Sequence, residues 1–179
     1  MNKTELLDAL RSSGQRAAET LAALPAERFE EGRYENGWNG RQILAHMASI
    51  EWTYPRLLDL AKSAPDGPRP AAPSASPAQP RMASGSPRIL SYNDRQVEKR
   101  EGVPVPDLIA EFQKNRAATI AAVEAADEAL LTKEITSAGG ANGPLATVFN
   151  FVAVQHVLGH LADITGDDGK SERHERADE

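Results

Sequence analysis

Apolar residues recur every three or four positions along four segments of the chain, with polar residues between them. This spacing is typical of amphipathic helices, which bury one stripe of side chains. In the first segment, Asn2 and Glu5 form a possible capping box, and Pro25 follows the last apolar position. The apolar positions are Leu6, Leu10, Ala17, Leu21 and Leu24. The segment predicts a first helix that ends near Pro25.

The second segment follows the residues NGWNGRQ, where Asn39 is placed to cap a helix and Gln42 to reach back to it. Its apolar stripe continues for several turns. The stripe consists of Ile43, His46, Met47, Ile50, Tyr54 and Leu57. The sequence therefore predicts a second helix with a histidine on its apolar side.

Two more long helices are predicted in the second half of the chain. A shorter helix is expected over RILSYNDRQVEKREG, ending or bending at Gly102, and the next begins near Pro106. That next helix has a core stripe of Leu108, Phe112, Ile120 and Val123. Glu111 and Arg116 are expected to face solvent. A glycine-rich loop, SAGGANGP, then leads to the last long helix, which has Pro144 near its first turn.

These helices predict an all-α protein. The best strand candidate, residues 132–136, is short and predicts no sheet. Four main helices with a long crossover between the second and third favour a four-helix bundle, formed by residues 1–168 as one domain. Residues 64–87 are rich in proline and are expected to form a mobile connection, or alternatively a lid. Residues 169–179 should form a charged flexible tail.

Composition narrows the choice of partners and of chemistry. The net charge of −6 argues against nucleic acid and against an anionic membrane surface as partners. No apolar run approaches the ~18 residues of a membrane span, and charges interrupt the N-terminal residues, so we expect a cytoplasmic protein of a bacterium-like cell. The chain has no cysteine, so a metal site would use only nitrogen and oxygen ligands.

Two of the four histidines, His156 and His160, lie four residues apart in QHVLGHLADI and continue the apolar stripe of the last helix. An i, i+4 pair places two imidazoles one helical turn apart, where they can share one metal ion. His46 offers a third nitrogen from across the bundle. Buried imidazoles also occur without a metal, paired with a carbonyl or water, so the spacing alone leaves both interpretations open. His174 lies among charged residues and is expected at the surface.

Other polar residues are candidates for orienting the histidines or for contacting a substrate. Asp163 follows His160 by three residues and shares its helix face. Glu51 lies on the second helix, and Asn39 and Arg41 lie near its start, where Arg41 is a candidate anchor for a substrate carboxylate. An ordinary solvated position is the alternative for each of them.

The motif GWNGRQILAHMASIEW, followed downstream by FVAVQHVLGHLADI, resembles the two signature helices of the DinB-like superfamily of four-helix-bundle metalloproteins. The segment from YNDRQVEKREG to ADEALL is similar to the N-terminal domain of the mycothiol-dependent maleylpyruvate isomerases, a branch of that superfamily. The resemblance implies that His46, His156 and His160 bind a divalent metal ion. That branch tends to carry a carboxylate at the position of His156, and it usually continues into a second domain. A general thiol-dependent role is therefore implied, rather than maleylpyruvate isomerisation.

Three protein nitrogens leave a coordination position open, as in catalytic zinc sites. Zinc is the expected metal, although imidazole also suits nickel, iron and copper.

A metal site with an open position is compatible with three functions. The first is a thiol S-transferase or isomerase that takes mycothiol or a similar small-molecule thiol as cosubstrate, together with an electrophilic substrate. The second is a hydrolase that activates water at the metal. The third is a non-catalytic metal-binding bundle in a stress response. By resemblance, a homodimer is expected.

Overall fold

The computed structural model describes residues 1–32, 37–64 and 87–166 of the chain. The predicted charged tail, and all of the predicted proline-rich connection except its two end residues, lie outside the described residues. In chain order the elements are α1 (Lys3–Ala23), α2 (Glu27–Glu30), α3 (Gly40–Glu51), α4 (Arg56–Ser63), α5 (Pro87–Glu98), α6 (Val105–Ala125), the 3₁₀ turn η1 (Glu128–Thr132), β1 (Glu134–Thr136), β2 (Asn142–Pro144), α7 (Leu145–Phe149), the π-helical turn η2 (Asn150–Gln155) and α8 (His156–Thr165).

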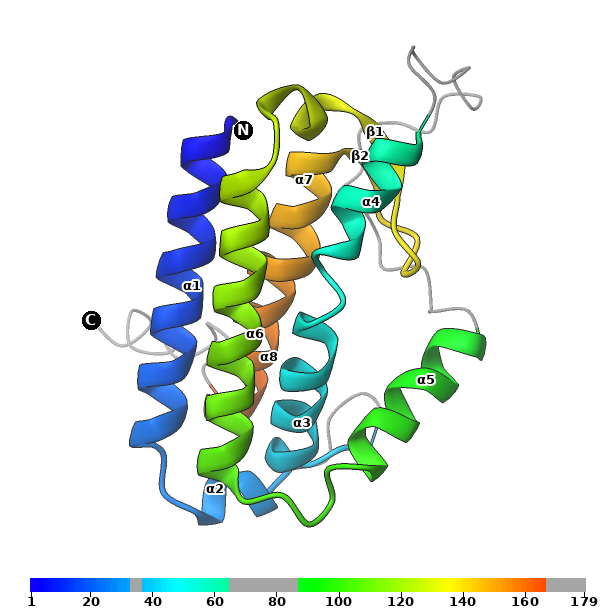
Figure 1. Ribbon diagram of the computed structural model, residues 1–179. Coiled ribbons are helices and arrows are strands. Elements are labelled where there is room, and N and C mark those ends of the chain that lie inside the picture. The colour runs from blue at the N-terminus through cyan, green and yellow to red at the C-terminus, as the bar shows by residue number, and fades with distance from the viewer. Residues whose placement is uncertain (33–36, 65–86, 167–179) are drawn as a thin grey trace, which may run out of the picture.

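The long helices form a closed bundle, as Figure 1 shows. Helix α6 packs against both α1 and α3, and the continuous stretch from α7 through η2 to α8 packs against α1 and, through α8, against α3. The connection from the second to the third bundle helix includes α5, which lies against α3. The all-α four-helix bundle with a long crossover, predicted from the sequence, is confirmed.

Capping boxes fix the starts of two bundle helices. At α1 the Asn2 side chain accepts from the Glu5 backbone N–H, and the Glu5 carboxylate accepts from the Asn2 N–H, both at 2.9 Å. At α3, Asn39 and Gln42 form the same reciprocal pair, also at 2.9 Å. Each box satisfies N–H groups that have no partner inside the helix. Both predicted helix starts are therefore confirmed, and the second places His46 two turns into α3.

The second bundle helix is not continuous, contrary to the prediction. Helix α3 ends at Glu51, a turn follows, and α4 begins at Arg56. Pro55 lies in this break. Proline has no N–H to donate to a helical hydrogen bond, so it interrupts the helix here. Tyr54 and Leu57 are nevertheless buried, so the apolar pattern continues through the break. The turn brings the Tyr54 hydroxyl into the bundle.

A two-stranded antiparallel hairpin precedes the last helix. Strand β1 pairs with β2 so that Ile135 lies opposite Gly143. The position of β1 agrees with the short strand candidate, but no sheet was predicted, because Asn-Gly-Pro has none of the β-branched or aromatic residues that mark a strand. The hairpin packs against α4 and α7 and lies at the end of the bundle away from α2 (Figure 1).

The core consists of two apolar clusters, one toward each end of the bundle. The cluster near α2 includes Leu21, Met47, Phe112 and Leu161, and the cluster near the hairpin includes Leu10, Tyr54, Val123 and Phe149. Four buried polar residues lie between the two clusters along α1, α3 and α6, namely Ser13, Glu51, Arg116 and Thr119. We call them the polar layer. The prediction that Arg116 faces solvent is wrong, since only 4% of the residue is exposed.

The stretch Leu145–Thr165 is long and apolar enough to cross a membrane by length and composition alone, with a mean hydropathy of 1.4. In this fold it is one of the helices of the bundle. Of its 18-residue apolar window, 44% is buried within the protein, and a core helix of a globular domain passes the same test. Its apolar character is therefore explained by packing within the bundle.

Gly40, the first residue of α3, permits a close approach between α2 and α3. A Cβ atom at this position would lie 2.8 Å from the Arg28 carbonyl oxygen and 3.2 Å from the Phe29 Cα. Because backbone atoms cannot move aside cheaply, we expect Gly40→Ala to lower the free energy of unfolding by about 1–3 kcal/mol in urea denaturation. Gly102→Ala is the control, because a Cβ there meets nothing within 4 Å. Equal stability of the two variants would contradict the close approach.

Candidate metal centre

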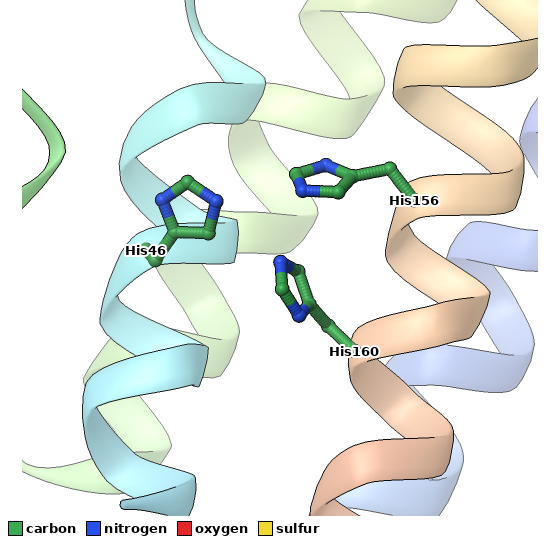
Figure 2. A group of neighbouring side chains, drawn as sticks. All are labelled: His46, His156 and His160. Carbon is green, nitrogen blue, oxygen red and sulfur yellow. The ribbon is translucent and has the colours of Figure 1, made fainter. Parts of the chain in front are cut away.

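The structure brings together the three histidines that the sequence singles out. His46 comes from the middle of α3 and is 3% exposed, while His156 and His160 lie on successive turns of α8. The ring centroids are 5.4 Å apart for His46 and His156, 5.2 Å for His46 and His160, and 4.4 Å for the α8 pair. One nitrogen of each ring lies within 4.8 Å of the other two. Figure 2 shows the three rings converging from two facing helices.

Two nitrogens of this cluster are buried without a hydrogen-bond partner among the described residues, His46 Nδ1 and His160 Nε2. Buried polar atoms nearly always have partners, because an unpaired one loses its bond to water without replacement. A cation shared by the three imidazoles would accept the lone pair of His160 Nε2 and one from each neighbouring ring. The donor set therefore fits a divalent metal ion with nitrogen ligands.

The electrostatics of the site keep the His46 and His156 imidazoles neutral. Burial lowers the pKa of His46 well below its ordinary value, and the neighbouring His160 and His156 lower it further. Burial and then His160 lower the pKa of His156 to about 3, against the opposing effects of the Val152 carbonyl and Asp163. Neutral imidazole is the form that offers a lone pair to a metal. Both rings are therefore in their ligating form at neutral pH.

The two histidines of α8 each have a polar neighbour at the ring nitrogen Nδ1. Asp163 Oδ2 lies 3.2 Å from Nδ1 of His160, the contact that their spacing of three residues predicts. Tyr54 Oη lies 3.5 Å from Nδ1 of His156 and donates a hydrogen bond to the Val152 carbonyl. In the sequence, Tyr54 is recognisable only as part of an apolar stripe. Its role depends on the turn between α3 and α4, which the periodicity did not reveal.

Glu51, a sequence candidate for orienting a histidine, instead faces α6. Its carboxylate pairs with the guanidinium of Arg116, with Oε1 2.9 Å from Nε and Oε2 2.9 Å from Nη2. Burial raises the pKa of Glu51 to about 7, while Arg116 acts in the opposite direction. Glu51 therefore belongs to the polar layer.

Arg41 and Asn39 lie at the start of α3, as predicted, and both have structural partners. The Arg41 guanidinium donates to the carbonyl oxygens of Glu101 and Val103, at 3.0 and 2.5 Å, and so ties α3 to the loop before α6. Asn39 caps α3 through Gln42. Any contact of either residue with a substrate stays a prediction.

A groove of about 510 Å³ lies beside this end of α3, between α3 and α5. Arg41 and Asn39 line it together with Trp38, and Asp94 and Glu98 of α5 contribute carboxylates. The Trp38 ring also packs on His46, with 5.3 Å between the ring centroids. Trp38 thus contacts both the groove and the histidine cluster.

Comparisons with known proteins agree with the fold. A family model described as the DinB superfamily matches residues 9–164. The solved structures of a mycothiol-dependent maleylpyruvate isomerase, and of a mutant of it with one histidine replaced by alanine, are similar at a TM-score of 0.65 and 16% sequence identity. The likeness covers 92% of this chain but 61% of the isomerase chain. A search of curated proteins finds no match. Because the family model spans most of the sequence, the chain belongs to the DinB superfamily.

Proposed function

We propose that the chain is a metal-dependent enzyme that binds a low-molecular-weight thiol of the mycothiol type at His46, His156 and His160, and transfers or isomerises an electrophilic substrate. The observation that carries the proposal is the convergence of three imidazoles with no fourth ligand in the cluster, within the part of the chain that the structure describes. Three protein ligands and one open position are typical of catalytic metal sites. Zinc is the proposed metal.

The site lies nearest to solvent on its α8 side, although Nε2 of His160 is itself buried. The His160 side chain is 18% exposed and the neighbouring Asp163 carboxylate 47%, whereas His46 is enclosed by the bundle. A ligand would therefore approach along the α8 side, past Asp163. The Asp163 carboxylate accepts from His160 Nδ1–H, and so it leaves Nε2 of that ring as the ligating atom. Trp38 packs on His46 and restricts the position of its ring.

A divalent ion held by the histidines would act as a Lewis acid that favours the thiolate form of an incoming thiol. The chain has no cysteine, so the sulfur would have to come from a separate molecule. Membership of the DinB superfamily and the fold shared with a mycothiol-dependent isomerase support this choice of cosubstrate. Arg41 and Asn39, which line the groove, are proposed contacts for the electrophilic substrate. The expected homodimer stays a prediction.

Cobalt(II) in place of the native metal gives a direct test. A thiolate bound to cobalt adds a sulfur-to-metal charge-transfer band in the near ultraviolet, which oxygen and nitrogen ligands do not produce. Because the protein has no sulfur ligand of the cysteine type, the band must come from added thiol. We expect a cysteine–sugar thiol of the mycothiol type to give a saturable band with the cobalt protein.

Two controls accompany the titration. The same compound with its sulfur methylated has no proton to lose and should give no band. His160→Ala should abolish the band given by the free thiol. If the free thiol gives no band although cobalt is bound, the thiol function is wrong, and a hydrolase or a non-catalytic metal-binding bundle becomes the better account of the site.

A further inference from the structure

The last helix of the bundle contains a π-helical turn immediately before the first histidine of α8. This turn, η2, covers Asn150–Gln155, and the His156 backbone N–H donates to the Phe151 carbonyl, five residues earlier. A π turn holds one residue more than an α turn, so it shifts the register of all that follows and leaves a carbonyl outside the regular ladder. The orientation of His156 therefore depends on how this turn is held.

Two side chains from other parts of the chain donate hydrogen bonds to consecutive carbonyls of η2. The Tyr54 hydroxyl, from the turn after α3, donates to Val152, and the Arg116 guanidinium, from α6, donates to Ala153 at 2.6 Å. Both donors are buried. The π turn is therefore bound from two sides by groups that lie deep in the bundle.

Tyr54 also constrains the protonation of His156. The Tyr54 proton is directed at the Val152 carbonyl, so its oxygen can only accept from His156 Nδ1, which lies 3.5 Å away. The Val152 carbonyl is a second acceptor beside the His156 ring, and the bond from Tyr54 holds it in place. A neutral imidazole carries one N–H. With that proton at Nδ1, the lone pair is at Nε2, the nitrogen left for the cluster.

We propose that Tyr54 is a positioning residue for the histidine site. It secures the π turn that presents His156, and it selects the Nδ1–H tautomer that leaves Nε2 free for a metal, while Arg116 holds the next carbonyl of the same turn. The consequence for metal binding rests on the proposed function. The tautomer of His156 does not.

The test compares Tyr54→Phe with a matched control, Thr53→Val, in the full chain. Tyr54→Phe removes one hydroxyl and keeps the ring in the core. Thr53→Val removes the neighbouring hydroxyl, which donates to the Ile50 carbonyl at 2.7 Å within its own turn. Nitrogen-15 NMR of the metal-free proteins would report the tautomer of each histidine, and competition with a chelator would report the affinity for Zn²⁺. Circular dichroism would report helical content.

In wild type and Thr53→Val we expect His156 as the single Nδ1–H tautomer, with equal zinc affinity. In Tyr54→Phe we expect a mixture of tautomers and an affinity about 10–100-fold lower, the usual effect of removing the partner of a metal-binding histidine, at unchanged helical content. A single unchanged tautomer in Tyr54→Phe would overturn the proposal, as would a changed tautomer with unchanged zinc affinity. If wild type binds no zinc, the proposed function fails, and the tautomer alone decides the role of Tyr54.

Discussion

Alanine in place of His46, His156 or His160 should lower the affinity of the chain for a divalent ion by more than about 100-fold. Each substitution removes one of only three protein ligands. Loss of a residue that only orients a metal-binding histidine already weakens binding by about 10–100-fold, so loss of one of three direct ligands should exceed that range. The effect should be similar for all three residues, because their nitrogens lie within 4.8 Å of one another and would share one ion.

Elemental analysis of protein purified without a histidine tag checks this expectation. Wild type should retain close to one ion per chain after dialysis against a mild chelator, and each of the three variants should retain almost none. His174→Ala changes the fourth histidine of the sequence, which lies outside the described residues, and is the natural control. Equal retention in all four variants would show that these imidazoles do not hold the metal.

The convergence of the three histidines could be predicted because it depends on local signals. The Asn39–Gln42 capping box fixes where α3 begins, and helical periodicity then places His46 on the inner face. The spacing of His156 and His160 places both on one face of α8. In a four-helix bundle the apolar faces of the helices pack inward, which brings the histidine faces of α3 and α8 together.

The polar layer was misread, although the sequence contained a signal for it. Arg116 was expected in solvent, but it lies four residues after Phe112 and seven before Val123, on the same stripe. Glu51 likewise lies four residues after the buried Met47. A charged residue at a stripe position in each of two neighbouring helices indicates a buried pair, because neither charge could be buried alone.

The π turn and the turn around Tyr54 had no comparable signal. Residues 145–165 are apolar with helical spacing on either side of η2, and a one-residue change of register leaves that pattern nearly intact. Two carbonyls of η2, those of Val152 and Ala153, accept from Tyr54 and Arg116, which lie 98 and 37 residues away in the sequence. Such a turn is stabilised by tertiary contacts, so local propensity could not reveal it.

Removing one partner of the buried ion pair in the polar layer should destabilise the bundle strongly. Arg116→Met would leave the fully buried Glu51 carboxylate without its cation, and would also remove the bonds from the guanidinium to the Leu10 carbonyl and Ser13 Oγ, both at 3.2 Å. Removing one partner of a buried pair typically lowers the free energy of unfolding by about 3–5 kcal/mol. Urea denaturation of the metal-free protein at pH 8 would measure the loss.

Two control variants separate the effect of the unpaired charge from that of packing. Glu51→Met combined with Arg116→Met removes both charges, and should be more stable than Arg116→Met alone, because packed apolar groups replace a buried pair at little or no cost. Arg11→Met breaks an exposed pair with Glu124, which joins α1 and α6 at the surface, and should cost about 0–1 kcal/mol. A double variant no more stable than Arg116→Met would show that the loss comes from packing rather than from the unpaired charge.

The effect of Arg116→Met should also grow with pH. Burial raises the pKa of Glu51 from its ordinary 4.5 to about 7 even with Arg116 beside it, and Arg116 opposes that rise, so the pKa in the variant lies higher still. A carboxyl whose pKa is raised by folding contributes stability below its unfolded pKa and loses that stability as the pH rises through its folded pKa.

Above pH 7, Arg116→Met therefore continues to lose stability after the wild type has stopped. The additional loss is about 1.4 kcal/mol for each pH unit between the folded pKa values of Glu51 in the two proteins. The difference between the two proteins should be smaller at pH 5 than at pH 9, and at pH 5 it should reflect the lost bonds to the Leu10 carbonyl and Ser13 Oγ. The double variant has no carboxyl at this position. It should therefore gain stability relative to wild type as the pH rises from 5 to 7. A difference between Arg116→Met and wild type that is constant from pH 5 to 9 would mean that Glu51 carries the same charge in both folded proteins throughout this range, so that Arg116 does not alter its titration there.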